Sequence, residues 1–264
     1  MSDFSLSRPP LICVAARVQY ARVDAIGSHI PALQEALRLN GYPLADDLVE
    51  TKTLRIEDRA EAGMNVEMLK FSRWDFANVE RTVTIRVDPE GVTLLFTAYD
   101  HFLNAEPHYR GIFGMVEKSI PALLPRMCQL RYIGYIPLTD GAVPTDWVIP
   151  SLLGMPNVGG LQRQGSFSET RFQSPEGGVL VTRCMSLGAG HPSLPPDLLP
   201  LAANLRYSSP SPEPFVLLEN LHQRPLEMAA FTVEGCLAAL SALRGSNAEV
   251  FRASVQPQAL EKWK

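Results

Sequence analysis

The sequence lacks any long apolar run and any sign of a targeting segment. Its apolar stretches all fall short of the roughly 18 residues that cross a bilayer, so no membrane segment is predicted. The start of the chain, Met1 to Pro10, is polar and has neither the basic beginning nor the apolar centre of a secretory signal. We therefore expect a cytoplasmic protein with no membrane partner.

Cysteine is scarce and never paired. The four cysteines have apolar neighbours and lie far apart, without a CxxC spacing: Cys13, Cys128, Cys184 and Cys236. This pattern is typical of buried free thiols in a reducing compartment. A disulfide framework or a zinc site is the weaker alternative, and we expect neither a bound metal nor a cofactor.

A surplus of basic residues is also missing. The 24 Lys and Arg residues face 28 Asp and Glu residues, a formal net charge of -4. A broad nucleic-acid surface is therefore not expected. A local patch stays open as an alternative, because Arg59, Arg73, Arg81 and Arg86 could share one face of a sheet, although a solvated face is the simpler interpretation.

The familiar catalytic signatures GxSxG, GxxxxGK[ST] and HExxH do not occur. One glycine-containing segment, Gly188 to Ser193, follows a predicted strand as a phosphate loop would. Its prolines remove backbone donors and no helix clearly follows, so we interpret it as an ordinary loop. Catalysis is not excluded on this ground, since active sites are assembled in space.

What the sequence does contain is strong strand and turn patterning. Alternating apolar and polar residues from Thr82 to Val87 predict a half-buried strand, and Val92 to Tyr99 returns as its hairpin partner. The turn between them, Asp88 to Gly91, has a glycine where we expect a positive φ. Further strands are predicted at several places: Leu11 to Tyr20, Leu48 to Ile56, Val66 to Phe71, Gln129 to Pro137, Phe167 to Gln173, Val179 to Leu187, Leu201 to Tyr207 and Phe215 to Leu221.

Helices are predicted after sets of antiparallel strands. Asp24 is expected to cap the first, Glu106 to Leu124 forms the second, and Thr232 is expected to cap the last. We therefore predict an α+β fold with a curved antiparallel sheet, or sheets, packed by long helices.

Proline is abundant, with 22 residues against 18 glycines. The prolines cluster at 121–156 and 192–225, which predicts long stiffened connections. We assign residues 1–140 to an N-terminal α+β half, 141–165 to a proline-rich connection and 166–264 to a C-terminal half, which could also form one compact domain. Two echoes support a hypothesis of related halves: Ser174 to Gly177 repeats a Pro-Glu-Gly turn, and Leu205-Arg206-Tyr207 repeats Leu130-Arg131-Tyr132.

The densest titratable cluster surrounds the start of the second predicted helix. Asp100, His101, Glu106 and His108 could supply an acid–base pair or metal ligands, although their spacing matches no recognised metal motif. The simpler interpretation is a polar loop in which Glu106 favours the positive end of the helix.

Aromatic residues gather around the first hairpin. Trp74, Tyr99, Phe102 and Tyr109 could line a pocket or a partner surface. Core packing of part of this set is the competing interpretation.

The order of these features resembles a sporadically distributed bacterial family of uncharacterised proteins with no established activity. The resemblance covers most of the chain and rests on the following segments: Leu11 to Val18, Phe71 to Phe76, Thr97 to Tyr99 leading to Phe102, Leu130 to Ile136, and the closing helix with Phe251 and the tail to Trp263. It implies an α+β cytoplasmic bacterial protein, associated with defence, toxin–antitoxin or specialised biosynthetic loci.

Three positions depart from the pattern of that family. Gly134 stands where an asparagine is usual, Arg244 where a histidine is expected, and Glu219 where an aspartate is frequent. Any polar site that the resemblance implies at these positions is therefore altered here.

The leading hypothesis is a non-enzymatic accessory protein that acts through a protein partner, with a homo-oligomer left open. The alternative is an enzyme or small-ligand-binding protein that uses Asp100, His101 or His108 in a pocket between sheet and helices. Nucleic-acid binding ranks third.

Overall fold

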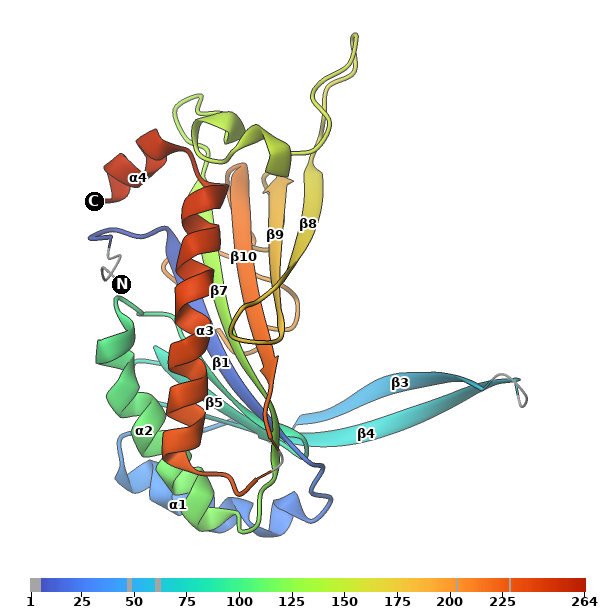
Figure 1. The fold of residues 1–264 in the computed structure, drawn as a ribbon, viewed down its shortest axis with the longest axis vertical. Helices are drawn as coiled ribbons and strands as arrows, with labels where there is room; N and C mark the ends of the chain where they lie inside the picture. The colour runs from blue at the N-terminus through green and yellow to red at the C-terminus, as the bar shows by residue number, and fades with distance from the viewer. Residues whose placement is uncertain (1–5, 47–48, 60–62, 203, 228) are drawn as a thin grey trace.

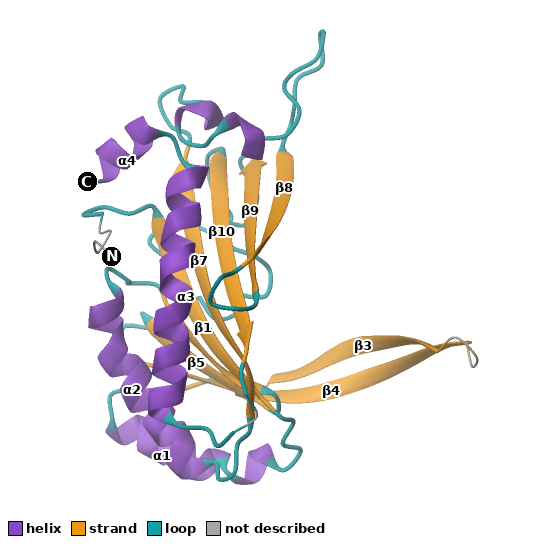
Figure 2. Ribbon diagram, in the orientation of Figure 1, coloured by secondary structure: helices purple, strands orange, loops and turns teal. Residues whose placement is uncertain are grey.

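The structure is a computed structural model that describes residues 6–46, 49–59, 63–202, 204–227 and 229–264. For residues 49–59 and 63–71 it describes the backbone. Within these ranges the chain forms a continuous antiparallel sheet with helices packed on one side (Figures 1 and 2). The prediction of an antiparallel sheet with helices is confirmed in this form.

The strand order across the sheet is β2-β4-β5-β6-β1-β7-β10-β9-β8, and β3 pairs with β4 outside this path. All pairs are antiparallel. The bounds are β1 Leu11–Tyr20, β2 Leu44–Ala45, β3 Val49–Arg59, β4 Gly63–Ala77, β5 Val83–Asp88, β6 Gly91–Phe96, β7 Pro125–Pro137, β8 Ser166–Gln173, β9 Val179–Leu187 and β10 Phe215–Pro225.

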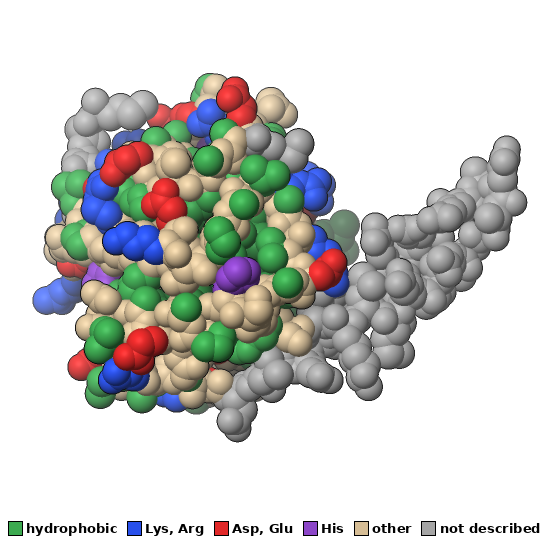
Figure 3. All heavy atoms as spheres, turned by 90° about the horizontal axis from the view of Figure 1, so that it is seen from below, with side chains coloured by type: hydrophobic (Ala, Val, Ile, Leu, Met, Phe, Trp, Pro, Cys, Tyr) green, Lys and Arg blue, Asp and Glu red, His purple; other side chains and the backbone are tan. Residues whose placement is uncertain are grey.

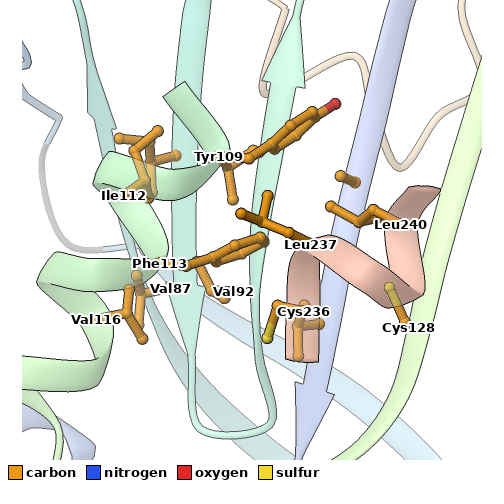
Figure 4. Close-up of a cluster of buried hydrophobic side chains, with 14 of the residues drawn as sticks. Val87, Val92, Tyr109, Ile112, Phe113, Val116, Cys128, Cys236, Leu237 and Leu240 are labelled. Atoms are coloured by element: carbon orange, nitrogen blue, oxygen red, sulfur yellow. The ribbon is translucent and has the colours of Figure 1, made fainter. Parts of the chain in front are cut away.

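Three helices cover one face of the sheet, and a fourth follows at the C-terminus. Their bounds are α1 Ile30–Leu39, α2 Phe102–Ser119, α3 Val233–Ser254 and α4 Pro257–Trp263, with 3-10 turns η1 Ile26–Ser28, η2 Pro144–Asp146 and η3 Pro150–Leu152. Figure 4 shows α2 and α3 contributing Phe113 and Leu237 to a core over Val87 and Val92 of β5 and β6. Strand alternation explains this core, because every second side chain points to the helices.

The opposite face of the sheet is only partly covered. Alternate residues of β1 belong to two clusters: Val14 faces the helices, whereas Cys13 contacts a second cluster on the other side. Leu194, Leu198 and Leu201 from the proline-rich loop pack onto that second cluster. The loop is therefore a packed cover over part of the sheet.

Several local predictions are corrected by the structure. The described residues of Leu201 to Tyr207, which are predicted as a strand, lie in a loop; Ala203 lies outside the described residues. The apolar side chains in this loop are buried against the second cluster, and this burial is what resembled a strand pattern in the sequence. The first helix begins at Ile30, and Asp24 does not cap it. Thr232 does cap α3, since its hydroxyl accepts a hydrogen bond from the Gly235 amide at 3.2 Å.

The turn between β5 and β6 needs its glycine for a different reason from the one predicted. The structure records positive φ at seven glycines and Gly91 is not among them. A Cβ atom at Gly91 would lie 2.8 Å from Arg17 Cζ and 3.0 Å from the Val18 carbonyl oxygen. Close approach of the neighbouring strand, and not a left-handed backbone, therefore selects glycine here.

The strand order is regular about the central pair β1 and β7. On one side the order continues β6, β5, β4, and on the other β10, β9, β8. Neither sequence echo coincides with this regularity: Asp88 to Gly91 joins β5 to β6 and Ser174 to Gly177 joins β8 to β9, whereas Leu205 to Tyr207 lies in a loop. The hypothesis of related halves stays a prediction.

The β3–β4 hairpin extends away from the body of the sheet (Figure 1). Its strands pair with each other from Val49 opposite Arg73 to Arg59 opposite Gly63. Strand β3 continues to Arg59, three residues beyond the predicted end at Ile56, and the predicted strand start at Leu48 lies outside the described residues. Pairing of β4 with β5 begins only at Trp74.

Candidate functional site

A cavity of about 210 Å³ lies between α3, the start of α2 and the strands β7 and β10. Leu6, Pro9 and Leu11 close one side of it from the N-terminal segment. Its walls are largely apolar, and its polar lining comes from residues far apart in the sequence: Tyr99, Asp100, His101, Tyr132, Asn220, Arg244, Asn247, Glu249 and Arg252.

Two tyrosine hydroxyls meet in this cavity. The oxygen atoms of Tyr99 and Tyr132 are 3.4 Å apart, and the two rings pack edge to face. Burial raises the pKa of Tyr99 and of Tyr132 above the ordinary tyrosine value. Both hydroxyls therefore stay protonated near neutral pH, where they act as neutral hydrogen-bonding groups and not as bases.

Two asparagines complete the polar lining from opposite elements. Asn220 on β10 accepts a hydrogen bond from the Thr182 hydroxyl at 2.9 Å, and no bond from its amide nitrogen is seen to a described residue. Asn247 on α3 is 2% exposed and donates to the Leu243 and Leu130 carbonyls at 3.1 and 3.5 Å. Its side-chain oxygen Oδ1 is buried and has no partner.

A second buried side-chain atom without a partner belongs to His222, which contacts the same carbonyl as Asn247. The His222 Nδ1 atom is 3.0 Å from the same Leu243 carbonyl, and it must donate because a carbonyl oxygen only accepts. Its other nitrogen, Nε2, is buried and also lacks a partner. Unpaired buried polar atoms are costly, so Asn247 Oδ1 and His222 Nε2 mark a part of the core in which the described residues leave polar groups unsatisfied.

The sequence-predicted residues Asp100 and His101 line the mouth of the cavity, where they also cap α2. Asp100 accepts from the His101 amide at 2.6 Å and from the Asn104 side chain at 2.7 Å, and the Asn104 bond lowers the pKa of Asp100. The His101 ring accepts from the Leu103 amide at 3.2 Å. An ionised capping carboxylate is poorly suited to general-acid chemistry.

The remaining members of the predicted titratable cluster lie elsewhere. The His108 Nδ1 atom lies 2.7 Å from the Tyr42 hydroxyl, beside α1, and His108 does not line the cavity. Glu106 pairs with Arg110 at 3.2 Å along α2. Because α2 begins at Phe102, four residues before the predicted start, these side chains are distributed around a helix and do not share a loop.

The predicted aromatic set divides between the cavity and the core. Tyr99 and Phe102 line the cavity, and the Arg244 guanidinium lies 5.2 Å from the centre of the Phe102 ring. Tyr109 is fully buried in the core beneath. Trp74 packs partly buried against the same core and contacts the Gly27 region.

Sequence reasoning did not select Tyr132, Asn220 or Asn247 as site residues. Tyr132 lies in a predicted strand, in the repeated Leu-Arg-Tyr segment and in the resemblance segment Leu130 to Ile136, but none of these marks it as a site residue. The asparagines carry no local pattern at all. Gly134 and Arg244, two departures from the resembled family, both line the cavity. A Cβ atom at Gly134 would lie 3.7 Å from Leu218 Cβ, an ordinary contact distance.

The described residues offer few sites for metal or thiol chemistry. Within the ranges given above, no group of three His, Cys, Asp or Glu side chains could hold a metal ion. All four cysteines are free and buried, as predicted, and burial raises the pKa of the Cys13 thiol to about 12. Among the described helices, none has the length and apolar character needed to cross a bilayer.

Comparison with known proteins adds no assignment: no family model matches the chain, and no curated protein is found to be similar in sequence. The resemblance given above stays a prediction. The geometry itself defines a cavity with apolar walls and a small number of polar groups, the neutral Tyr99, Tyr132, Asn220 and Asn247 and the charged Asp100, Arg244, Glu249 and Arg252, which is typical of a ligand-binding pocket.

Proposed function

We propose that this chain binds a small organic molecule in the cavity between α3, α2 and the sheet. The observation that carries the proposal is the buried, unpartnered Oδ1 atom of Asn247, a residue that lines the same cavity as the Tyr99 and Tyr132 hydroxyl pair. A ligand that donates an N–H or O–H would satisfy this acceptor, whereas an apolar ligand would leave it unpaired.

The size of the cavity limits the ligand. An engineered apolar cavity of roughly 150 Å³ binds benzene, so a cavity of about 210 Å³ admits a buried portion of about eight to ten non-hydrogen atoms. Leu11, Phe102 and Leu218 supply apolar walls for such a ring system. Binding is favoured over catalysis, because Asp100 is engaged in capping and the tyrosines stay protonated.

Matched aromatic probes test the proposal. Indole, phenol and benzamide each carry a donor, and indene copies the shape of indole without one. We expect indole to bind by ligand-observed NMR and calorimetry about threefold to tenfold more tightly than indene, the usual net value of one hydrogen bond. The variant Asn247→Leu should erase that preference.

A cavity-filling variant separates this pocket from adventitious binding. Gly134→Leu places a side chain into the cavity from a strand position and should abolish indole binding. Gly111→Leu is the matched control, because Gly111 is exposed on α2 with nothing within 4 Å of a Cβ atom. The proposal is wrong if none of the donor probes binds, or if Gly134→Leu binds indole as the wild-type chain does.

A second proposal concerns a protein partner. The β3–β4 hairpin supports it, since the hairpin extends from the sheet and its paired residues contact chiefly each other (Figure 1). A two-stranded hairpin is marginally stable alone in water, so a partner that packs against this ribbon would stabilise it. The predicted association with a defence, toxin–antitoxin or biosynthetic locus would fit such an accessory role.

Shortening the ribbon tests the second proposal. Replacing residues 51–71 with a short Gly-Ser turn should leave thermal unfolding of the body unchanged and remove any partner that co-purifies with the wild-type chain from its host. Amide hydrogen exchange in the ribbon should slow when the purified partner is added back. An unchanged set of co-purifying proteins, or unchanged exchange, would contradict it.

A further inference from the structure

A second hollow lies on the face of the sheet opposite the helices. This groove has a volume of about 440 Å³ and crosses the strands from β4 to β10. Asp197, Leu198 and Leu201 of the proline-rich loop form one wall. Four arginines line it: Arg17, Arg73, Arg86 and Arg131.

Two of these arginines, Arg17 and Arg131, are neutralised by carboxylates of their own. Arg17 donates to both oxygens of Asp88 at 2.9 and 3.1 Å. Arg131 contacts Asp197 at 2.6 Å and Glu219 at 2.8 Å. Such bidentate and shared pairs hold each guanidinium in place and leave little uncompensated charge.

Arg86 and Arg73 share a single carboxylate unequally. Arg86 donates to both oxygens of Asp75, from Nε at 2.7 Å and from Nη2 at 2.6 Å. Arg73 reaches the same Asp75 only through a 3.9 Å contact from Nε, which is too long for a hydrogen bond. Two positive charges therefore face one negative charge at this end of the groove.

Arg73 is held in an environment that is unfavourable for an unpaired cation. Its side chain is 20% exposed, and its buried Nε atom has no hydrogen-bond partner. Burial and the neighbouring Arg86 charge lower the pKa of Arg73, against the smaller opposing effect of Asp75. Uncompensated charge of this kind is expected where a protein binds an anion.

We infer that the Arg73–Arg86 end of this groove is an oxyanion site that takes the phosphate or carboxylate group of a small organic molecule. The planar Arg73 guanidinium makes no hydrogen bond to a described residue, and its N–H donors have the geometry that recognises such groups. No hydrogen bond from the third Arg86 nitrogen, Nη1, is seen to a described residue, so it supplies a second donor. The rest of the molecule lies along the groove towards Thr93 and Gln129.

The surrounding charge favours a small anion over a nucleic acid. Asp88, Glu90 and Asp197 line the same groove and would repel a polyanion that followed it. Arg81, another member of the sequence-predicted arginine face, is turned to Asp46 at 2.8 Å, and the Arg59 side chain lies outside the description. Figure 3, which views the lower end of the molecule in Figure 1, shows basic and acidic side chains interspersed on that end.

The test follows the arginine Nε–Hε signals by NMR during titration with inorganic phosphate and, separately, with acetate, at constant ionic strength held by chloride. We expect the Arg73 and Arg86 signals to shift in a saturable way with either or both probes. The relative affinity of phosphate and acetate then identifies the preferred oxyanion. Chloride alone should produce no saturable shift.

Variants assign the effect to Arg73. Arg73→Gln should weaken binding at least about tenfold, the usual consequence of losing a charge-assisted pair, and Arg73→Lys should give an intermediate loss. The matched control Arg171→Gln removes an exposed arginine from the edge strand β8 and should leave affinity unchanged.

Thermal unfolding provides a second readout that does not depend on binding kinetics. Without oxyanion, Arg73→Gln should raise the Tm because it removes an unpaired cation. Phosphate should raise the Tm of the wild-type chain and not that of Arg73→Gln. No saturable shift with either probe, or equal binding by wild type and Arg73→Gln, would overturn the inference, and indole binding at the helix-side cavity would be unaffected by that outcome.

Discussion

The two faces of the sheet bury their polar groups in opposite ways. The helix-covered face carries the neutral groups Tyr99, Tyr132 and Asn247 in the wall of a small cavity, and the charged residues that also line this cavity, Asp100, Glu249 and Arg252, are exposed. The open face carries charged groups, with Glu219 only 1% exposed between Arg131 and Arg183. Adjacent residues of one strand divide between the two arrangements, since Glu219 points to the charged side and Asn220 to the neutral side.

This difference follows from what covers each face. Helices exclude water from one side, where an unpaired charge would be prohibitive and neutral hydrogen-bonding groups are tolerated. The open side is partly hydrated and supports arginine–carboxylate pairs that span neighbouring strands. Pairing is nevertheless incomplete on both faces: Asn247 Oδ1, His222 Nε2 and the Tyr109 hydroxyl lack a partner on the neutral side, and Arg73 Nε lacks a hydrogen-bond partner on the charged side.

The largest loss of stability is expected when Glu219, the most buried charged residue of the open face, loses its charge. Glu219→Gln removes the carboxylate that Arg131 and Arg183 each contact at 2.8 Å. We expect the free energy of unfolding to fall by about 3–5 kcal/mol in urea titrations, because two cations lose a buried partner.

The neighbouring residue provides the control for that measurement. Asn220→Ala removes a neutral hydrogen bond with Thr182 and should cost about 1–3 kcal/mol. Equal losses for Glu219→Gln and Asn220→Ala would mean that the two faces do not differ in the way described.

Alkaline pH should affect both faces alike. Burial raises the pKa of Cys13 on the open side and of Cys236 on the helix side to about 12 each. A thiol in the unfolded chain ionises near pH ~8.5, so the stability from each protonated thiol is complete below that pH and is lost as pH rises towards 12.

The measurement is urea unfolding under reducing conditions near neutral pH and about one pH unit above the ordinary thiol pKa. Cys13→Ala and Cys236→Ala should each reduce the alkaline loss of unfolding free energy by about 1 kcal/mol. A pH-independent difference between either variant and the wild type would contradict this assignment of the thiols.

The smallest change in stability is expected for a Tyr→Phe substitution made once on each face of the sheet. Tyr109 is buried on the helix side with an unpartnered hydroxyl, whereas the Tyr135 hydroxyl on the other side lies 2.6 Å from the Ser211 hydroxyl. Tyr109→Phe should therefore stabilise the chain by about 0.5–1 kcal/mol, and Tyr135→Phe should destabilise it by a similar amount. Changes of the same sign in urea titrations would refute the contrast.

Much of the local structure is predictable from the sequence. The strand bounds Leu11 to Tyr20 and Val179 to Leu187 match β1 and β9, and the β5–β6 hairpin is confirmed. Prediction fails where apolar residues pack without forming an element, as at Leu201 in the loop. Local hydrophobicity reports burial, but it does not distinguish a strand from a loop that lies against a sheet.

The candidate sites are far less predictable. Asp100 and His101 were selected because they are close in sequence, and the structure uses them to cap α2 at the mouth of the cavity. The sequence leaves open that Arg73 and Arg86 share one face of a sheet, yet no pattern in it indicates that they use Asp75 unequally. Which arginine forms the hydrogen bonds with Asp75 depends on the exact distances between side-chain atoms, and the alternation of residues along a strand does not specify these distances.

The sequence by itself determined which residues alternate along each strand, where several turns fall and that the thiols are buried. Only the tertiary structure decided that β7, β10 and α3 bring Tyr132, Asn220 and Asn247 to one cavity, and that Arg73 lacks a full partner. The physical reason is that alternation and capping arise between chain neighbours. An unpaired buried atom is defined by every group around it, and those groups come from segments that only strand pairing and helix packing place together.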